Sequence, residues 1–234
     1  MRTVVVTGIE RADAGVADRL GAHGVATVHE AMGRTGLLGP GLRPIQDGER
    51  IAGTAVTVLC WPGDNLMIHA AVEQCREGDI LVVTTTSPSL DGSFGELFAT
   101  ALRHRGVRGL VTTGGVRDVA ELRALGFPAW AAAVNAQGTV KATAGSVNVP
   151  VAIGGTVVRP GDVIIADDDG VLCVPRTEAP GALRAADARA AKEADSRADY
   201  STGGLSLDRN KLRGLLDGLG VRYITAAEYG SGDG

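Results

Sequence analysis

The chain has 234 residues, enough for one large domain or two small ones, and its 44% hydrophobic and 21% charged residues are proportions typical of a globular protein. Its net charge of −4 and the lack of a basic run argue against a nucleic-acid partner. No apolar run approaches the roughly 20 residues that cross a bilayer, so no membrane partner is expected either.

The cysteines and the start of the chain favour a cytoplasmic protein. The cysteines are odd in number and form no CxxC pair, which indicates neither a disulfide framework nor a zinc site; they are Cys60, Cys75 and Cys173. The chain leads from Met1-Arg2 directly into the strand-like Thr3-Val4-Val5-Val6, without a signal peptide. A cytoplasmic location is therefore the default expectation.

Helix and strand patterns alternate along the first half of the chain. Apolar residues at helical spacing predict helices, and Val- and Thr-rich alternation predicts strands. We expect helices over residues 11–23, 65–75, 96–104 and 118–124. We expect strands over residues 51–59, 80–84, 109–113 and 128–134, and a loop rich in Gly and Pro over residues 33–48.

The second half of the chain is first rich in strands and then helical. Residues 139–175 carry mostly strand signals, and Asp169-Gly170 has the composition of a hairpin turn. A long alanine-rich helix is expected from Glu178 to Tyr200, a second one from Leu205 to Leu219, and a frayed end from Glu228 to Gly234. A polar, alanine-rich helix at the end of a chain often packs on a neighbouring subunit.

These elements predict a single α/β domain of layered sheets with a helical C-terminal extension. No internal repeat, linker or low-complexity block divides the chain. We expect the α/β core over residues 1–177, the helical extension over residues 178–224 and a frayed end over residues 225–234.

Two short stretches carry the clearest chemical signal. The first, Gly95-Glu96-Leu97-Phe98, begins a predicted helix, where unpaired backbone N–H groups and the helix dipole attract an anion such as a carboxylate. The second, Gly114-Gly115-Val116-Arg117-Asp118, follows a predicted strand and offers a guanidinium beside a carboxylate, after two glycines that let a ligand approach the backbone. Because α/β folds place ligands at adjacent strand and helix ends, the two stretches together suggest a site for a 2-oxo acid and a metal.

Each stretch also has a purely structural interpretation. Two runs have the pattern of a capping box: Asp118-Val119-Ala120-Glu121 and Ser93-Phe94-Gly95-Glu96. In a capping box the first side chain caps the helix and the glutamate reaches back to the N–H of that first residue. An arginine such as Arg117 is most often a surface residue, and a helix start can be capped by water. From these patterns alone both interpretations stay open.

Three further residues have a functional and a structural interpretation. Asn65 follows the turn Pro62-Gly63-Asp64, where either Asp64 or Asn65 caps a helix, and its amide could equally face a ligand. Lys141 is either a site cation or an exposed strand residue. Glu193 has arginines four residues to either side, a pattern typical of an exposed ion pair worth about 0.3–0.5 kcal/mol.

Two other groups of polar residues point to no metal site. The run Asp167-Asp168-Asp169-Gly170 lacks the spaced ligands and terminal glutamate of an EF-hand, so it indicates a hairpin turn. The histidines form no metal-spaced pair; they are His23, His29, His69 and His104.

The chain resembles the divalent-metal-dependent pyruvate aldolases that cleave 4-hydroxy-4-methyl-2-oxoglutarate and 4-carboxy-4-hydroxy-2-oxoadipate, whose relatives include the regulators of ribonuclease E activity. The resemblance covers nearly the whole chain. It is carried by residues 24–31, Pro62-Gly63-Asp64-Asn65, Gly95-Glu96-Leu97, residues 109–118, Gly138-Thr139-Val140-Lys141, Val147-Asn148-Val149-Pro150 and residues 166–171. The C-terminal extension resembles the aldolase branch in particular, through Lys192-Glu193 with Arg197 and through Gly204-Leu205-Ser206-Leu207-Asp208. The shorter regulators generally lack this extension.

The resemblance implies an α-β-β-α sandwich that assembles into a homotrimer or homohexamer, with the site at a subunit interface. By position, Asp118 matches the residue that binds Mg²⁺ directly, and Glu96 matches an acidic residue that holds a metal-bound water. Glu193 matches the acidic residue that a neighbouring subunit contributes.

The same resemblance implies how the substrate binds. Arg117 matches the arginine that contacts the pyruvyl oxygen, and the amides from Gly95 to Phe98 (through Glu96 and Leu97) match the carboxylate cradle. Asn65 and Lys141 match further substrate-binding positions.

The implied function is retro-aldol cleavage of a 4-hydroxy-2-oxo acid to pyruvate and a second 2-oxo acid in the catabolism of aromatic compounds. Mg²⁺ is the expected cofactor, with Mn²⁺ or Co²⁺ as substitutes, and oxaloacetate decarboxylation is the expected side activity. The residues do not identify the general base, for which a metal-bound water is the first candidate. The alternatives are a non-catalytic regulator of a ribonuclease E-type protein and a lyase that applies the same chemistry to another 2-oxo acid.

Two departures concern the substrate. Many aldolases of this type have a Tyr and a Met after the segment that matches Leu207-Asp208, where this chain has Arg209-Asn210-Lys211-Leu212-Arg213. Thr112-Thr113 replaces a more usual hydrophobic-acidic pair. The natural substrate is therefore less determined than the reaction.

Overall fold

The computed structural model describes residues 3–230. Contacts divide the chain into two units, Met1–Arg189 and Ala190–Gly234. The division lies within helix α6 (Ala179–Ser201), because Ala179, Ala182, Leu183 and Ala186 are buried against the first unit. The first unit therefore extends past residue 177, where we expected the core to end.

The first unit is built on a nine-stranded sheet with the strand order β1-β6-β5-β3-β2-β10-β11, to which β4 and β7 pair at β5 and β2. Its central strands β2, β3, β5 and β6 are parallel, whereas β10 and β11 are antiparallel. A separate hairpin pairs β8 with β9. The strands are β1 (Arg43–Pro44), β2 (Ile51–Cys60), β3 (Asp79–Thr85), β4 (Gly92–Phe94), β5 (Gly109–Val116), β6 (Ala129–Val134), β7 (Ser146–Val147), β8 (Val151–Ile153), β9 (Thr156–Val158), β10 (Val163–Asp167) and β11 (Gly170–Val174).

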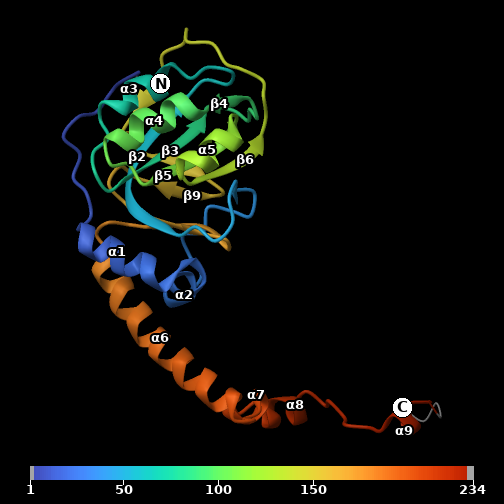
Figure 1. The fold of residues 1–234 in the computed structure, drawn as a ribbon. Helices are drawn as coiled ribbons and strands as arrows, with labels where there is room; N and C mark the ends of the chain where they lie inside the picture. Colours follow the sequence, from blue (N-terminus) through green and yellow to red (C-terminus); the bar gives the residue numbers. More distant parts are fainter. Residues whose placement is uncertain (1–2, 231–234) are drawn as a thin grey trace. The chain divides into compact units, whose positions relative to one another are not determined.

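Helices cover the two outer faces of this unit. The helices α3 (Leu66–Val72), α4 (Glu96–His104) and α5 (Val119–Leu125) share one hydrophobic cluster with the parallel strands, and Figure 1 shows α4 and α5 over these strands. The helices α1 (Ala14–His23) and α2 (Val25–Ala31) share another cluster with β10, β11 and the start of α6.

Alternation along the strands separates these clusters. Val56 and Val58 of β2 face the cluster under α3, α4 and α5, whereas Ala55 faces a middle cluster that contains no helical residue. Ile164 of β10 faces the middle cluster and Ile165 faces α1 and α2, because successive strand residues point to opposite faces. One continuous sheet thus lines the middle cluster, with helices packed outside it in the other two clusters, and the predicted α/β fold class is confirmed.

Several element boundaries differ from those predicted. The expected strand Thr3–Val6 is wrong, since only Val5 forms an isolated bridge, to Val147. Helix α1 begins at Ala14 rather than residue 11, because the Asp13 carboxylate accepts a hydrogen bond from the Val16 N–H at 2.9 Å and caps it there. Helix α3 ends at Val72, three residues earlier than expected.

The hairpin between β10 and β11 has Asp168 and Asp169 as its two central residues, since Asp167 pairs with Gly170. The tight turn was predicted in this run, but one residue later. The predicted strand at residues 109–113 is β5, which continues to Val116.

The second unit consists of the rest of α6 followed by α7 (Ser206–Arg209), α8 (Arg213–Gly218) and α9 (Ala226–Gly230). The single helix expected from Leu205 to Leu219 is wrong, because the chain turns between α7 and α8, where Lys211 has a φ of 54°. Part of the expected frayed end, residues 231–234, lies outside the described residues. Among the described residues, no helix has both the length and the apolar character needed to cross a membrane.

Candidate functional site

The candidate site begins where β5 ends. After Val116 the chain exposes Arg117 and then turns at Asp118, whose φ of 54° and ψ of 41° lie in the left-handed region. A residue other than glycine adopts this conformation at a cost of about 1–2 kcal/mol, and such strain is concentrated at functional sites. Helix α5 follows at once from Val119.

The left-handed turn directs the Asp118 carboxylate away from its own helix. It makes no capping hydrogen bond to α5, so the capping-box interpretation of Asp118 to Glu121 is wrong. Its Oδ2 instead accepts a hydrogen bond from the Glu96 N–H at 3.2 Å and lies 3.8 Å from the Arg117 Nε. With a side chain that is 42% exposed, the carboxylate keeps lone pairs free for a ligand.

Gly95 makes this approach possible. A Cβ on Gly95 would collide with the Asp118 carboxylate, so only glycine lets α4 begin here. Gly95 is also the N-cap of α4, and the Glu96 side chain accepts from the Thr100 hydroxyl at 2.6 Å rather than reaching back to Ser93. The second capping-box interpretation is therefore wrong as well.

The first turn of α4 presents backbone donors. As expected at a helix start, the N–H groups of Leu97 and Phe98 have no hydrogen-bond acceptor among the described residues. These N–H groups and the helix dipole favour an anion at this position.

The first turn of α4 and the end of β5 border one pocket of about 320 Å³. It contains seven of the predicted site residues: Asn65, Gly95, Leu97, Phe98, Arg117, Asp118 and Lys141. The remaining lining residues are His69, Val72, Ser93 and Ala101. Glu96 touches the site through its backbone N–H, whereas Glu193 belongs to the second unit.

A buried aspartate fixes the wall opposite α4. Asp64 accepts hydrogen bonds from the backbone N–H groups of Leu66, Ala142 and Thr143 at 2.7–2.8 Å, which ties the segment around Lys141 to the start of α3. Burial alone would raise the pKa of Asp64, but these N–H donors outweigh it and lower the pKa below its usual range. Asn65 thus occupies the N-cap position of α3 without a side-chain capping bond, and the Asp64 side chain accepts from the first N–H of the helix instead.

Asn65 and His69 stand one helical turn apart on the pocket side of α3. The Asn65 Nδ2 donates to the Ser93 carbonyl oxygen at 3.1 Å, which links α3 to the strand that precedes Gly95. The His69 ring lies against Phe98, with ring centroids 4.5 Å apart. From the sequence we considered His69 only as a candidate metal ligand, although its four-residue spacing from Asn65 predicts that the two side chains share one face of a helix.

Gly115 of β5 makes room for a neighbouring backbone segment rather than for the ligand that we expected. Gly114 and Gly115 are buried within the strand, and a Cβ on Gly115 would collide with the Leu90 carbonyl oxygen. The Gly115 N–H donates to the Asp91 carbonyl oxygen at 3.0 Å. Gly115 therefore lets the segment around Leu90 and Asp91 approach the strand closely.

The pocket lacks a cysteine nucleophile. All three cysteines are buried, and burial raises the pKa of the thiols of Cys60 and Cys75 to about 12. Thiols that stay protonated at neutral pH are poor nucleophiles.

The described residues contain no group of three or more His, Cys, Asp or Glu side chains that could hold a metal ion by themselves. Mg²⁺ is commonly bound by only one or two carboxylates together with waters and substrate oxygens. The exposed carboxylate of Asp118 fits that habit.

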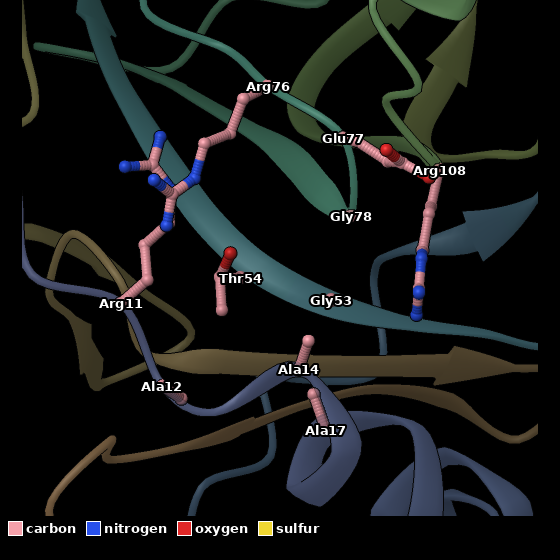
Figure 2. A pocket seen from close by; sticks show the side chains of 10 residues that line it. All are labelled: Arg11, Ala12, Ala14, Ala17, Gly53, Thr54, Arg76, Glu77, Gly78 and Arg108. Carbon is pink, nitrogen blue, oxygen red and sulfur yellow. The ribbon is translucent and has the colours of Figure 1, made fainter.

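A second, smaller cavity of about 60 Å³ shares no described lining residue with the pocket. Figure 2 shows Arg11 and Arg76 approaching it from the N-terminal segment and from the turn before β3. Arg11 binds the buried Asp79 through two hydrogen bonds of 2.8 Å, and the Thr54 hydroxyl donates to the same carboxylate at 2.6 Å. This buried ion pair ties the N-terminal segment to the sheet.

Comparisons with known proteins agree with this fold. The model of the RraA-like family, described as Aldolase/RraA, matches residues 25–173. A protein of Halalkalibacterium halodurans named "Putative 4-hydroxy-4-methyl-2-oxoglutarate aldolase" is 30% identical over 157 residues, which cover 67% of this chain and 73% of that protein. A protein of the same name from Burkholderia multivorans is 38% identical over 142 residues, covering 61% of this chain and 86% of that one.

A solved structure shares the fold. Streptomyces coelicolor RraAS2, described as an unusual member of the RNase ES inhibitor RraA protein family, superimposes with a TM-score of 0.74 at 28% identity, covering 81% of this chain and 99% of that one. The family match spans more than half of the chain and includes both the start of α4 and the end of β5. The chain therefore belongs to the RraA-like (Aldolase/RraA) family.

Proposed function

We propose that this protein is a divalent-metal-dependent aldolase. It cleaves a 4-hydroxy-2-oxo dicarboxylic or tricarboxylic acid, such as 4-hydroxy-4-methyl-2-oxoglutarate or 4-carboxy-4-hydroxy-2-oxoadipate, to pyruvate and a second 2-oxo acid. The observation that carries the proposal is the convergence of a strained, exposed Asp118, Arg117 and the free amides of α4 on one pocket. The aldolase names of two relatives support the same reaction class.

In this proposal the start of α4 and the end of β5 bind different atoms of the substrate. The N–H groups of Leu97 and Phe98 bind the C1 carboxylate, since they are unpaired donors at a helix start. The Arg117 guanidinium donates a hydrogen bond to the C2 oxygen, where negative charge develops as the C3–C4 bond breaks. Asn65, at the start of α3, and Lys141, in the segment tied to that start by Asp64, line the pocket and bind the rest of the substrate.

Asp118 would hold Mg²⁺, with Mn²⁺ or Co²⁺ as substitutes, together with waters, one of them held by Glu96. A bound divalent cation polarises the 2-oxo group as a Lewis acid. Asp118 suits this role because its carboxylate is fixed by one backbone N–H and still exposed. The same chemistry on oxaloacetate would give pyruvate and CO₂ as a side activity.

We further propose that the protein acts as a homotrimer or homohexamer in which Glu193 reaches the site of a neighbouring subunit. Among the described residues that line the pocket, Asp118 alone carries a carboxylate, so a second metal-binding carboxylate would come from another chain. The location in the cell is proposed to be the cytoplasm.

The proposal is tested by mixing the purified protein with Mg²⁺ and either oxaloacetate or 4-hydroxy-4-methyl-2-oxoglutarate and measuring pyruvate release. We expect release from both, and loss of both activities on addition of EDTA. Activity that survives EDTA, together with trapping of Lys141 by pyruvate and borohydride, would favour a Schiff-base aldolase instead.

The resemblance to RraAS2 keeps a second candidate, a regulator that binds a ribonuclease E-type protein. The strained Asp118 beside Arg117 favours the enzyme, because a binding surface has no need of such a conformation. A protein that releases no pyruvate but inhibits such a ribonuclease would decide for the regulator.

A further inference from the structure

The pocket contains one imidazole among its described residues, and the structure fixes where it stands. The side chain of His69 lines the pocket from α3 and packs against the Phe98 ring at a centroid distance of 4.5 Å and an interplanar angle of 56°. Phe98 belongs to the turn whose N–H groups are proposed to bind the C1 carboxylate. The imidazole is thus held in the pocket lining next to the turn that is proposed to bind the C1 carboxylate.

The other polar groups that line the described pocket are poor proton acceptors at neutral pH. The Lys141 ammonium and the Arg117 guanidinium have no free lone pair. The Ser93 hydroxyl and the Asn65 amide are not bases, and the Asn65 Nδ2 is committed to the Ser93 carbonyl oxygen. Asp118 is assigned to the metal, which leaves the imidazole of His69 as the side-chain base among the described lining residues and the alternative to a metal-bound water.

The surroundings of His69 favour its neutral form, which is the form that can accept a proton. Partial burial and, second, the Lys141 ammonium lower the pKa of His69 below its usual range. Arg117 and Asp118 line the pocket from the junction of β5 and α5, and Glu73, the C-cap of α3, follows His69 by four residues. A neutral imidazole at pH 7 has one ring nitrogen with a free lone pair.

We propose that His69 is the general base of the retro-aldol reaction. This assignment rests on the proposed function and supplies the residue that the function leaves open. A ring nitrogen of His69 takes the proton of the C4 hydroxyl, the C4–O bond becomes a carbonyl, and the C3–C4 bond breaks with its electrons passing to the C2–C3 enolate. The imidazolium then returns the proton to C3, which completes the methyl group of pyruvate and leaves His69 neutral.

Oxaloacetate provides an internal control for this step. Its C3–C4 bond breaks with loss of CO₂, so no C4 hydroxyl proton has to be removed. The variant His69→Asn should therefore lose about 100-fold or more of kcat/KM for 4-hydroxy-4-methyl-2-oxoglutarate, the usual contribution of a general base, and less than about 3-fold for CO₂ release from oxaloacetate. His104→Asn, at the end of α4 and outside the pocket lining, is the matched control and should change neither.

The outcomes separate this assignment from the proposed function. Equal losses on both substrates, or no loss on either, would overturn the role of His69 while the aldolase function stands. A wild-type protein inactive on both substrates would overturn the function and the assignment together.

A second measurement uses the charge of Lys141. Lys141→Met removes a cation that lowers the pKa of His69, so NMR titration of the metal-free variant should show the His69 ring protons shifting at a higher pH than in the wild type. Because the base must be deprotonated, the acid limb of the kcat/KM profile should move to higher pH with it. A limb that stays in place while the titration of His69 moves would overturn the proposal.

Discussion

At the scale of single residues, Asp118 combines two requirements that one substitution cannot satisfy. Its left-handed backbone favours glycine, while the proposed chemistry needs a carboxylate. Asp118→Gly should therefore remove most turnover and keep or slightly raise Tm. Asp118→Ala should be equally inactive but about 1–2 kcal/mol less stable than the glycine variant, because alanine retains the strain.

The measurements are the rate of pyruvate release and the free energy of unfolding of both variants.

Arg117→Ala should lose turnover to a similar extent without a large change in stability, since its side chain is 47% exposed. Full activity in any of these folded variants would refute the assignments of Arg117 and Asp118.

Gly95 offers a test of position rather than of charge. In Gly95→Ala the new Cβ would collide with the Asp118 carboxylate and push it from the Glu96 N–H. We expect turnover to fall at least about 10-fold, since misplacing a catalytic group by about 1 Å can cost 100-fold. Gly214→Ala, within α8 and with no heavy atom within 4 Å of the new Cβ, is the control. Retention of full turnover in Gly95→Ala would show that the contact is unimportant.

At the scale of elements, the N-terminal segment depends on one buried ion pair. The side chains of Arg11 and Asp79 are only 9% and 0% exposed, and Asp79 also accepts from the Arg76 N–H at 2.8 Å. Arg11→Met would leave Asp79 buried without its cation, at a cost of about 3–5 kcal/mol. Chemical denaturation should show this loss. The control Arg34→Met removes an exposed pair with Glu30 and should leave the denaturation midpoint nearly unchanged.

Elements with a strong local signal could be predicted from sequence, and those decided by distant contacts could not. The period-two pattern of β2 and the helical pattern of α4 gave bounds that match the structure to within a residue. The two capping boxes were misleading because Asp118 bonds the start of α4, 22 residues away in the chain. Local spacing contains no information about that contact.

In the candidate site, too, the residues with a local sequence signal could be predicted and those placed by distant contacts could not. The residues at the end of β5 and the start of α4 could be placed together from the rules for α/β folds, and they line one pocket. His69 was missed because its position depends on packing against Phe98, and the purpose of Gly115 was misread because Leu90 approaches it from a distant loop.

At the scale of the whole molecule, the second unit leaves many apolar side chains exposed. Leu215, Leu219, Tyr223 and Tyr229 are between 56% and 78% exposed. An exposed apolar surface of this kind is typical of a segment that packs on another chain. It is consistent with the proposed homotrimer or homohexamer, which sedimentation of the purified protein would measure directly.

The shared site can be tested by subunit mixing. Glu193→Ala and Asp118→Ala should each be nearly inactive alone. If each site uses Asp118 of one chain and Glu193 of its neighbour, random co-assembly at equal amounts restores about a quarter of the sites, because half of the first chains meet half of the second. Pyruvate release from the co-assembled protein, at about a quarter of the wild-type rate, measures this.

Arg117→Ala mixed with Asp118→Ala is the matched control. Both residues line the pocket of the same chain, so no mixture of these variants contains a complete site. This pair should stay inactive on co-assembly. If the Glu193 pair also stays inactive while the two chains demonstrably co-assemble, Glu193 acts within its own subunit or not at all, and the C-terminal unit would serve assembly rather than catalysis.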